Sequence, residues 1–129
     1  MQRYGLIGRA LSHSFSKEHF KEKFRREGLS DCRYDLYELP AIGDLPTLLA
    51  ETPDLRGFNV TIPYKESIIP YLSGLDPLAA AVGAVNTVAM HDGRLTGHNT
   101  DVHGFRKLVE PALAGLQEPG SDIRPRALV

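Results

Sequence analysis

The sequence predicts an α/β domain of three layers, in which a mostly parallel mixed sheet contains one antiparallel hairpin and has helices on both faces. Segments with the apolar content of buried strands alternate along the chain with segments of helical periodicity, which favours a largely parallel sheet. Asp92 and Gly93 form an Asp-Gly pair between two apolar-rich segments, as expected for a hairpin turn. The chain has 129 residues, 42% hydrophobic and 24% charged, which suits one globular domain with its own core.

The first part of the chain predicts strand, helix and strand. "RYGLIG" (3–8) has the content of a short buried strand that ends at a glycine. "SKEHFKEKFRREG" (16–28) places Phe20 and Phe24 on one helical face and finishes with a glycine, which is typical of a helix C-terminus. In "CRYDLYEL" (32–39) alternate side chains would point to opposite faces of a sheet, which indicates a second strand.

The middle of the chain predicts two helices around a third strand. "IGDLPTLLAET" (42–52) is expected to be helical because Pro46 suits an early helical position. "GFNV" (57–60) predicts a short strand. "PYKESIIPYL" (63–72) is expected to be a helix that Pro63 opens.

The last part predicts a helix, a hairpin and another helix. "DPLAAAVGA" (76–84) is expected to be a helix that stops near its glycine, and "AVNTVAMHDGRLTGHNT" (84–100) is the hairpin. "DVHGFRKLVEPAL" (101–113) gathers its apolar side chains on one helical face. We therefore expect one domain over residues 1–114, followed by a linker and the beginning of a further strand over 115–129.

The composition argues against several classes of protein. With 15 Lys and Arg against 16 Asp and Glu the net charge is −1, and no basic stripe indicates nucleic-acid binding. Cys32 is the only cysteine, which excludes an internal disulfide and a Cys-based zinc site, and His91, His98 and His103 lack partners at metal-ligand spacing. No apolar run reaches the roughly 18 residues of a membrane helix. We expect a cytoplasmic protein without metal, nucleic-acid or membrane partners.

Polar side chains gather at the ends of the predicted strands. In open α/β sheets, ligands bind beyond the carboxyl ends of strands, where helix N-termini point inward. Together these side chains offer hydroxyls, amides, one lysine and one carboxylate, which suits a small, polyhydroxylated, anionic ligand. They are Ser12, His13, Ser14, Ser16, Asn59, Thr61, Lys65, Asn86, Thr87, Asn99, Thr100 and Asp101.

Several of these residues also have a structural interpretation. Ser16, Thr100 and Asp101 are good helix-start residues and could act only as caps. Asn86 could bond to neighbouring backbone inside the hairpin. His13 is more often a structural histidine than a general base. Taken singly, these residues do not distinguish a binding site from ordinary local structure.

Lys65 is the exception, because no structural argument favours it. If Pro63 opens a helix, Lys65 lies in the first turn, where the macrodipole disfavours a cation. A lysine and an aspartate together could instead act as an acid/base pair at a carbon–oxygen centre. Lys65 and Asp101 are therefore the candidate catalytic pair.

The sequence resembles the substrate-binding domain of the shikimate dehydrogenase family. The resemblance covers roughly residues 4–110 and implies NADP-dependent reduction of 3-dehydroshikimate to shikimate, a step in chorismate and aromatic amino acid biosynthesis. The motifs that carry it, in the family's order and spacing, are "GRALSHSFSKEHF", "GFNVTIPYKE", "AVGAVNTV" and "GHNTDVHGF".

The resemblance implies a role for each matching side chain. Two hydroxyls would hold the shikimate carboxylate, three side chains would contact ring hydroxyls, and the lysine and aspartate would handle the proton at the C3 oxygen. These residues are Ser14 and Ser16 for the carboxylate, Thr61, Asn86 and Asp101 for the hydroxyls, and Lys65 with Asp101 for catalysis. The family usually has proline at Ala10 and often at Lys17, so we expect a slightly different shape for the first loop.

The resemblance also implies a cofactor domain that this chain does not contain. Family members continue into a Rossmann domain whose glycine-rich turn binds NADP, and "RALV" (126–129) is similar to the first strand of that domain. We expect no cofactor-binding residue here, no activity of the chain alone, and self-association through apolar surface left uncovered. A quinate/shikimate paralogue, which could use NAD, and a non-catalytic module for a shikimate-like acid remain as alternatives.

Overall fold

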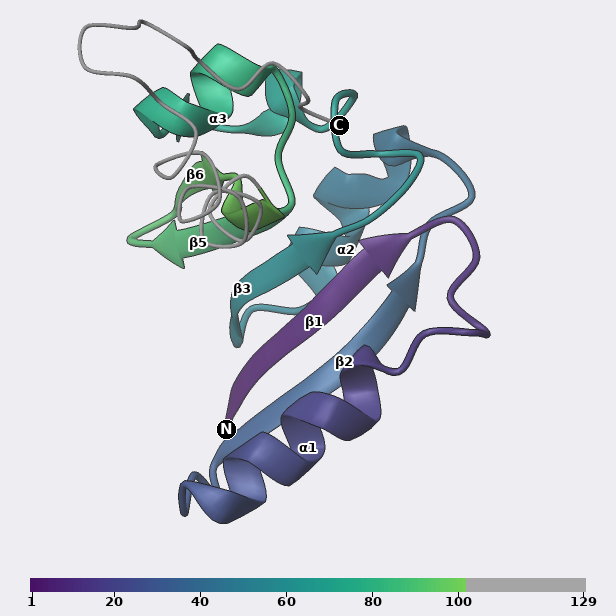
Figure 1. The fold of residues 1–129 in the computed structure, drawn as a ribbon, viewed down its shortest axis with the longest axis vertical. Coiled ribbons are helices and arrows are strands. Elements are labelled where there is room, and N and C mark those ends of the chain that lie inside the picture. Colours follow the sequence, from purple (N-terminus) through teal and green to yellow (C-terminus); the bar gives the residue numbers. More distant parts are fainter. Residues whose placement is uncertain (102–129) are drawn as a thin grey trace, which may run out of the picture.

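A computed structural model describes residues 1–101 and shows a six-stranded sheet with the order β2-β1-β3-β5-β6-β4 (Figure 1). Three α-helices and two 3₁₀ turns connect the strands. The strands are β1 (Gln2–Gly8), β2 (Cys32–Glu38), β3 (Leu55–Val60), β4 (Gly74–Leu75), β5 (Thr87–His91) and β6 (Arg94–His98). The helices are α1 (Ser16–Arg26), α2 (Leu45–Glu51) and α3 (Pro77–Val82), with 3₁₀ turns η1 (Ile42–Asp44) and η2 (Ile69–Tyr71).

The sheet is mixed and mostly parallel, as predicted. β1 runs parallel to both β2 and β3, and β4 runs parallel to β6. β5 is antiparallel to β3 and to β6. Asp92 and Gly93 turn the β5–β6 hairpin with φ angles of 48° and 76°, the positive values that a tight two-residue hairpin turn requires. The predicted hairpin is confirmed.

Helices cover both faces of the sheet, which confirms the predicted layering. Alternate residues of a strand point to opposite faces, so the neighbours Leu6 and Ile7 of β1 belong to different cores. Ile7 packs with Leu45 of α2 in the larger cluster. Leu6 packs with Tyr34, and Phe20 and Phe24 of α1 cover this smaller cluster. In Figure 1, α1 lies against β1 and β2 on one side and α2 lies on the other.

The predicted α-helix over 63–72 is wrong. The segment forms consecutive turns that end in η2, and only its Ile68 N–H makes a helix-like bond, to the carbonyl of Tyr64 at 3.1 Å. Pro70 cannot donate a backbone hydrogen bond, which prevents the helical ladder from continuing. The buried Tyr64 also directs its hydroxyl to the Leu39 carbonyl. Lys65 therefore lies in a turn, and the helix-dipole argument that singled it out does not apply.

The remaining differences are small. The helix predicted over 42–52 begins as the 3₁₀ turn η1 and becomes α-helical at Leu45, with Pro46 in its first positions. The two-residue strand β4 was not predicted, because so short a segment has no periodicity. The helix predicted over 101–113, the end of the domain at 114 and the linker and strand over 115–129 lie outside the described residues, apart from position 101.

Candidate functional site

The register of the sheet brings four strand ends to one edge. Ile7 of β1 pairs with Val60 of β3, so these parallel strands end side by side. Thr87, the first residue of β5, pairs with Asn59 on one side and with His98, the last residue of β6, on the other. The segments that follow β1, β3 and β6 and the segment that precedes β5 therefore meet at the carboxyl edge, where ligands bind in open α/β sheets.

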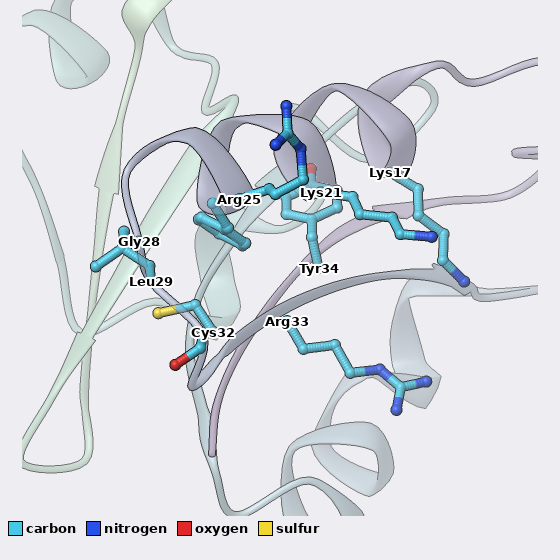
Figure 2. A pocket seen from close by; sticks show the side chains of 10 residues that line it. Lys17, Lys21, Arg25, Gly28, Leu29, Cys32, Arg33 and Tyr34 are labelled. Atoms are coloured by element: carbon cyan, nitrogen blue, oxygen red, sulfur yellow. The ribbon is translucent and has the colours of Figure 1, made fainter.

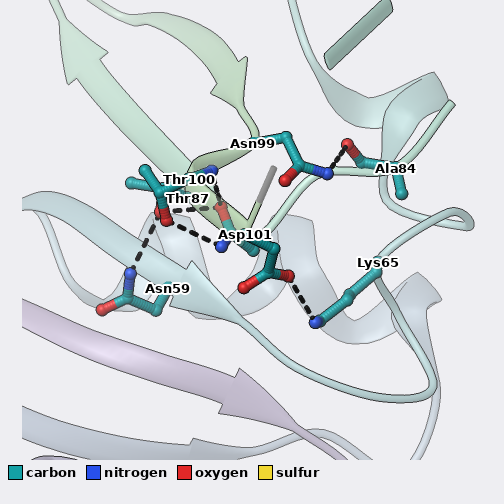
Figure 3. Close-up of polar contacts among 8 residues, drawn as sticks. Asn59, Lys65, Ala84, Thr87, Asn99, Thr100 and Asp101 are labelled. Atoms are coloured by element: carbon teal, nitrogen blue, oxygen red, sulfur yellow. Dashed lines mark hydrogen bonds and ion pairs between the residues drawn. The ribbon is translucent and has the colours of Figure 1, made fainter. Parts of the chain in front are cut away.

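Lys65 and Asp101 form an ion pair at this edge (Figure 3). The Lys65 ammonium donates to Oδ2 of Asp101 at 2.9 Å, and the two side chains are 34% and 50% exposed. The backbone holds the lysine, because its carbonyl accepts from the Val85 N–H at 2.7 Å. Such an exposed pair adds little to stability, but it leaves both charges accessible to a ligand.

The Asn86 side chain makes two hydrogen bonds to Thr100, the residue before Asp101. Its Oδ1 accepts from the Thr100 backbone N–H at 2.9 Å, and its amide nitrogen donates to the Thr100 hydroxyl at 2.8 Å. Asn86 is 9% exposed. The structural interpretation of Asn86 is thus partly correct, since it binds backbone, but that backbone comes from the segment after β6. The bonds fix the segment after β6 that carries the Asp101 carboxylate.

The first loop carries Ser14 and leads into α1, which begins at Ser16; both serines are half-buried. The Ser14 hydroxyl accepts from the Ser16 N–H at 3.2 Å, and the Leu11 N–H donates to the Glu38 carboxylate at 3.0 Å, which ties the loop to the end of β2. Phe15 is the N-cap of α1 and makes no side-chain capping bond, whereas Ser16 is the first helical residue, so the capping interpretation of Ser16 is wrong. No direct contact within residues 1–101 joins either serine to Lys65.

Thr61 follows β3 and lies beside the first loop. Its N–H donates to the Ile7 carbonyl at 2.9 Å, which extends the β1–β3 pairing past the strand end. A Cβ on Gly8 would lie 2.6 Å from Cγ2 of Thr61 and 2.7 Å from Cδ2 of Leu11. A side chain at position 8 would therefore force Thr61 and Leu11 to shift, so glycine suits this close approach of the two loops.

Asn59 and Tyr34 support the cluster, although Tyr34 was not among the polar residues expected at the strand ends. Asn59 accepts from the Tyr34 hydroxyl at 2.9 Å and donates to Thr87 at 3.2 Å. Burial raises the pKa of Tyr34 to about 12, while an interaction with the Ser16 side chain opposes this rise. An asparagine inside a strand and a tyrosine on the α1-covered face were visible signals, but only the fold shows that they meet.

Asn99 and His98 stabilise the segment around α3. The Asn99 amide, 4% exposed, donates to the Ala84 carbonyl at 3.0 Å. Nδ1 of His98 lies 2.9 Å from Oδ2 of Asp76, which is the N-cap of α3. Within residues 1–101 no group of three His, Cys, Asp or Glu side chains is arranged to hold a metal ion.

One cavity lies away from this cluster. It measures about 550 Å³ and opens between α1 and β2 (Figure 2). Three of its basic side chains already face carboxylates of the protein: Lys17 and Arg33 contact Asp35, and Arg25 contacts Glu22. These contacts weaken the case for an anion site. The polar residues at the sheet edge remain the better candidate.

A second cavity of about 400 Å³ lies over the sheet face beside α1. Tyr4, Phe20 and Phe24 make its wall apolar, and Asn59 and Thr87 border it at the end nearest the polar cluster. No helix within residues 1–101 is long and apolar enough to cross a membrane.

The chain is similar to known proteins over most of its length. A family model described as the shikimate dehydrogenase substrate binding domain matches residues 6–88. A shikimate dehydrogenase (NADP(+)) of Syntrophomonas wolfei is 44% identical over 126 residues, which are 96% of this chain and 40% of that protein. The corresponding protein of Pelodictyon phaeoclathratiforme is 44% identical over 103 residues, 78% of this chain and 36% of its own length.

A solved structure has the same fold. Shikimate 5-dehydrogenase of Thermus thermophilus, in complex with NADP(H) and shikimate, superposes with a TM-score of 0.76 at 34% identity. The match covers 87% of this chain and 42% of that one. The chain spans about two fifths of the length of the curated relatives it matches, whose matched shares are 36% and 40%.

Proposed function

Because this chain belongs to the shikimate dehydrogenase substrate-binding domain family, we propose that it binds shikimate and 3-dehydroshikimate and supplies the proton-handling residues of an NADP-dependent shikimate dehydrogenase. Residues 1–114 form the substrate domain in this proposal, with 115–129 leading into a cofactor domain. The relatives and the Thermus thermophilus complex support the choice of substrate.

The observation that carries the proposal is the Lys65–Asp101 pair. Its 2.9 Å contact lies at the carboxyl edge of the sheet, and Asp101 directly follows Thr100, whose N–H is held by Asn86. A lysine that is 34% exposed is accessible to an incoming oxygen atom. The carboxylate beside it fixes the direction of the ammonium through their hydrogen bond.

The remaining residues would orient the ring. Ser14 and Ser16 bind the carboxylate of the substrate in this proposal, while Thr61 and Asn86 contact its ring hydroxyls. When the C3 carbonyl is reduced, its oxygen gains negative charge and requires a proton. Lys65 donates that proton, Asp101 orients the ammonium, and the reverse reaction returns the proton to Lys65.

The described residues do not fit a dinucleotide cofactor. In the dinucleotide fingerprint a strand leads through closely spaced glycines into a helix. After β1 the chain reads "GRALSHSFS", with a single glycine, and β2 and β3 are followed by "LPA" and "TIPYK". NADPH supplies a hydride in the relatives' reaction, and we assign no residue of 1–101 to it. The proposal therefore includes no turnover by this chain alone.

Calorimetric titration of the chain with shikimate tests the proposal. We expect saturable binding, abolished or strongly weakened in Asp101→Asn and retained in Lys21→Ala, which removes a remote cation from the large cavity. Quinate, with one more ring hydroxyl, should bind more weakly. Absence of shikimate binding by the folded chain would overturn the proposal. Tighter binding of quinate would assign the site to the quinate paralogue.

A kinetic assay tests the assignment of chemistry. With 3-dehydroshikimate and NADPH, the chain alone should not oxidise NADPH above the rate without protein. Turnover would show that this chain binds the cofactor and would contradict its assignment to substrate binding alone.

A further inference from the structure

A relay of hydrogen bonds runs across the sheet to the segment that carries Asp101. The Tyr34 hydroxyl bonds to Asn59 at 2.9 Å, and the Asn59 amide bonds to the Thr87 hydroxyl at 3.2 Å. Thr87 bonds in turn to Oδ1 of Asn86 at 3.1 Å. The relay therefore joins a tyrosine of β2, 5% exposed, to the polar cluster at the carboxyl edge.

One backbone group fixes the direction of every bond in this relay. The Thr100 N–H can only donate, so the Asn86 atom that it meets at 2.9 Å must be the oxygen. Because that oxygen can only accept, the Thr87 hydroxyl must donate its single hydrogen to it. The Thr87 oxygen is then left to accept from the Asn59 nitrogen. The Asn59 oxygen then faces Tyr34, whose hydroxyl donates. Both amide orientations follow from this one donor.

Asn86 thus has its oxygen fully engaged and its nitrogen turned to Thr100. The nitrogen carries two hydrogens, and within residues 1–101 it donates only to the Thr100 hydroxyl, at 2.8 Å. One donor remains for a ligand. Without Thr87, the Asn86 oxygen would have only one donor, and a slight rotation of the side chain would redirect the free hydrogen.

We propose that Thr87 is a positioning residue, whose hydroxyl holds the Asn86 amide so that its free N–H donates to a ring hydroxyl of the substrate. This inference rests on the proposed function, since it assumes that Asn86 meets a hydroxylated ligand. Asn59 and Tyr34 hold Thr87 in turn. Thr87 itself does not contact the ligand.

Three variants of the full chain separate this role from general stability. Thr87→Val keeps the shape and strand propensity but lacks the donor, and Thr87→Ser keeps the donor. Thr96→Val is the matched control, because it removes a hydroxyl from β6 that makes no hydrogen bond within residues 1–101. Thr87→Val should weaken shikimate binding about fivefold, the effect of losing one ordinary hydrogen bond. Thr87→Ser and Thr96→Val should stay within about twofold of the unmodified chain.

Side-chain NMR gives a readout that does not require the ligand. In Thr87→Val the Asn86 carboxamide resonances should shift, and Thr87→Ser should restore them. Unchanged Asn86 resonances together with unchanged affinity in Thr87→Val would overturn the inference, and so would loss of affinity in Thr87→Ser. If the unmodified chain does not bind shikimate, the proposed function fails, while the resonances still decide whether Thr87 orients Asn86.

Discussion

The Lys65 ammonium lies 2.9 Å from the Asp101 carboxylate although 36 positions separate the two residues. Two different anchors produce this contact. The Val85 N–H holds the lysine backbone, and the Asn86 side chain holds the Thr100 N–H just before the aspartate. The charged groups meet because β3 and β6 end at the edge of the sheet where β5 begins. The two anchors hold the charged groups in contact, although the exposed ion pair itself adds little to stability.

Loss of the Lys65 ammonium should reduce turnover far more than binding. In a full-length enzyme that carries this domain, Lys65→Ala should lower kcat by about 10²–10⁴-fold, the usual contribution of an acid/base group. The KM for shikimate should change by less than about tenfold, since the other polar contacts remain. Steady-state kinetics measure both. A kcat near that of the unmodified enzyme would refute the proton-handling role of Lys65.

A side chain at position 8 should separate the two loops of the site. The added Cβ of Gly8→Ala would lie 2.6 Å from Thr61 and 2.7 Å from Leu11, closer than carbon atoms can approach. We expect a loss of about 1–3 kcal/mol in the free energy of unfolding, with weaker shikimate binding. Gly74→Ala is the matched control, because it has no atom within 4 Å of the new Cβ. Urea unfolding of both variants measures the difference, and equal stabilities would contradict the packing argument.

Tyr34 should titrate at a pH well above the ordinary value for a tyrosine. Burial raises its pKa to about 12, so the hydroxyl stays protonated and continues to donate to Asn59 through the neutral range. The raised pKa stabilises the fold below the unfolded pKa of about 10, and this contribution is lost as the pH rises toward 12.

Ultraviolet titration of phenolate absorbance checks the prediction for Tyr34. Tyr34→Phe should remove a high-pH step near 12 and cost about 1 kcal/mol of stability, the value of one buried hydrogen bond. Tyr71→Phe, on an exposed side chain, should leave that step in place. A complete titration of all tyrosines near pH 10 in the folded chain would exclude the inferred burial.

Asp76 should make stability depend on acid pH. Its pKa is lowered, chiefly because its carboxylate accepts the Ala79 N–H at the start of α3 and also because it contacts His98. A lowered pKa stabilises the fold above the unfolded pKa of about 3.9, and this contribution is lost as the pH falls through the folded pKa. Asp76→Ala should cost about 1 kcal/mol near neutral pH through the lost cap.

Asp76→Asn separates the charge of Asp76 from its cap. The amide oxygen can still accept the Ala79 N–H, so the variant should be intermediate in stability near neutral pH. Its difference from the unmodified chain should shrink as the pH falls below about 4. Urea unfolding across this range measures the effect. A difference that does not vary with pH would show that the charge contributes nothing.

Local patterns predicted most of the secondary structure because they report local preferences. The Phe20–Phe24 spacing gave α1, and Asp92 with Gly93 gave the β5–β6 turn. The prediction over 63–72 was wrong because Pro63 was taken as the opening of an α-helix, whereas Pro70 and the buried Tyr64 favour turns. A buried aromatic anchor depends on tertiary contacts, which local preference does not include.

The sequence by itself determined the family, the fold class and the short set of polar residues at the strand ends. It could do so because turn residues, hydrophobic periodicity and motif spacing depend only on the order of residues along the chain. Only the tertiary structure decided which of those residues meet: Lys65 with Asp101, and Asn86 with Thr100 and Thr87. The physical reason is sheet register. A shift of one residue would turn each side chain to the opposite face, and register depends on contacts between distant strands.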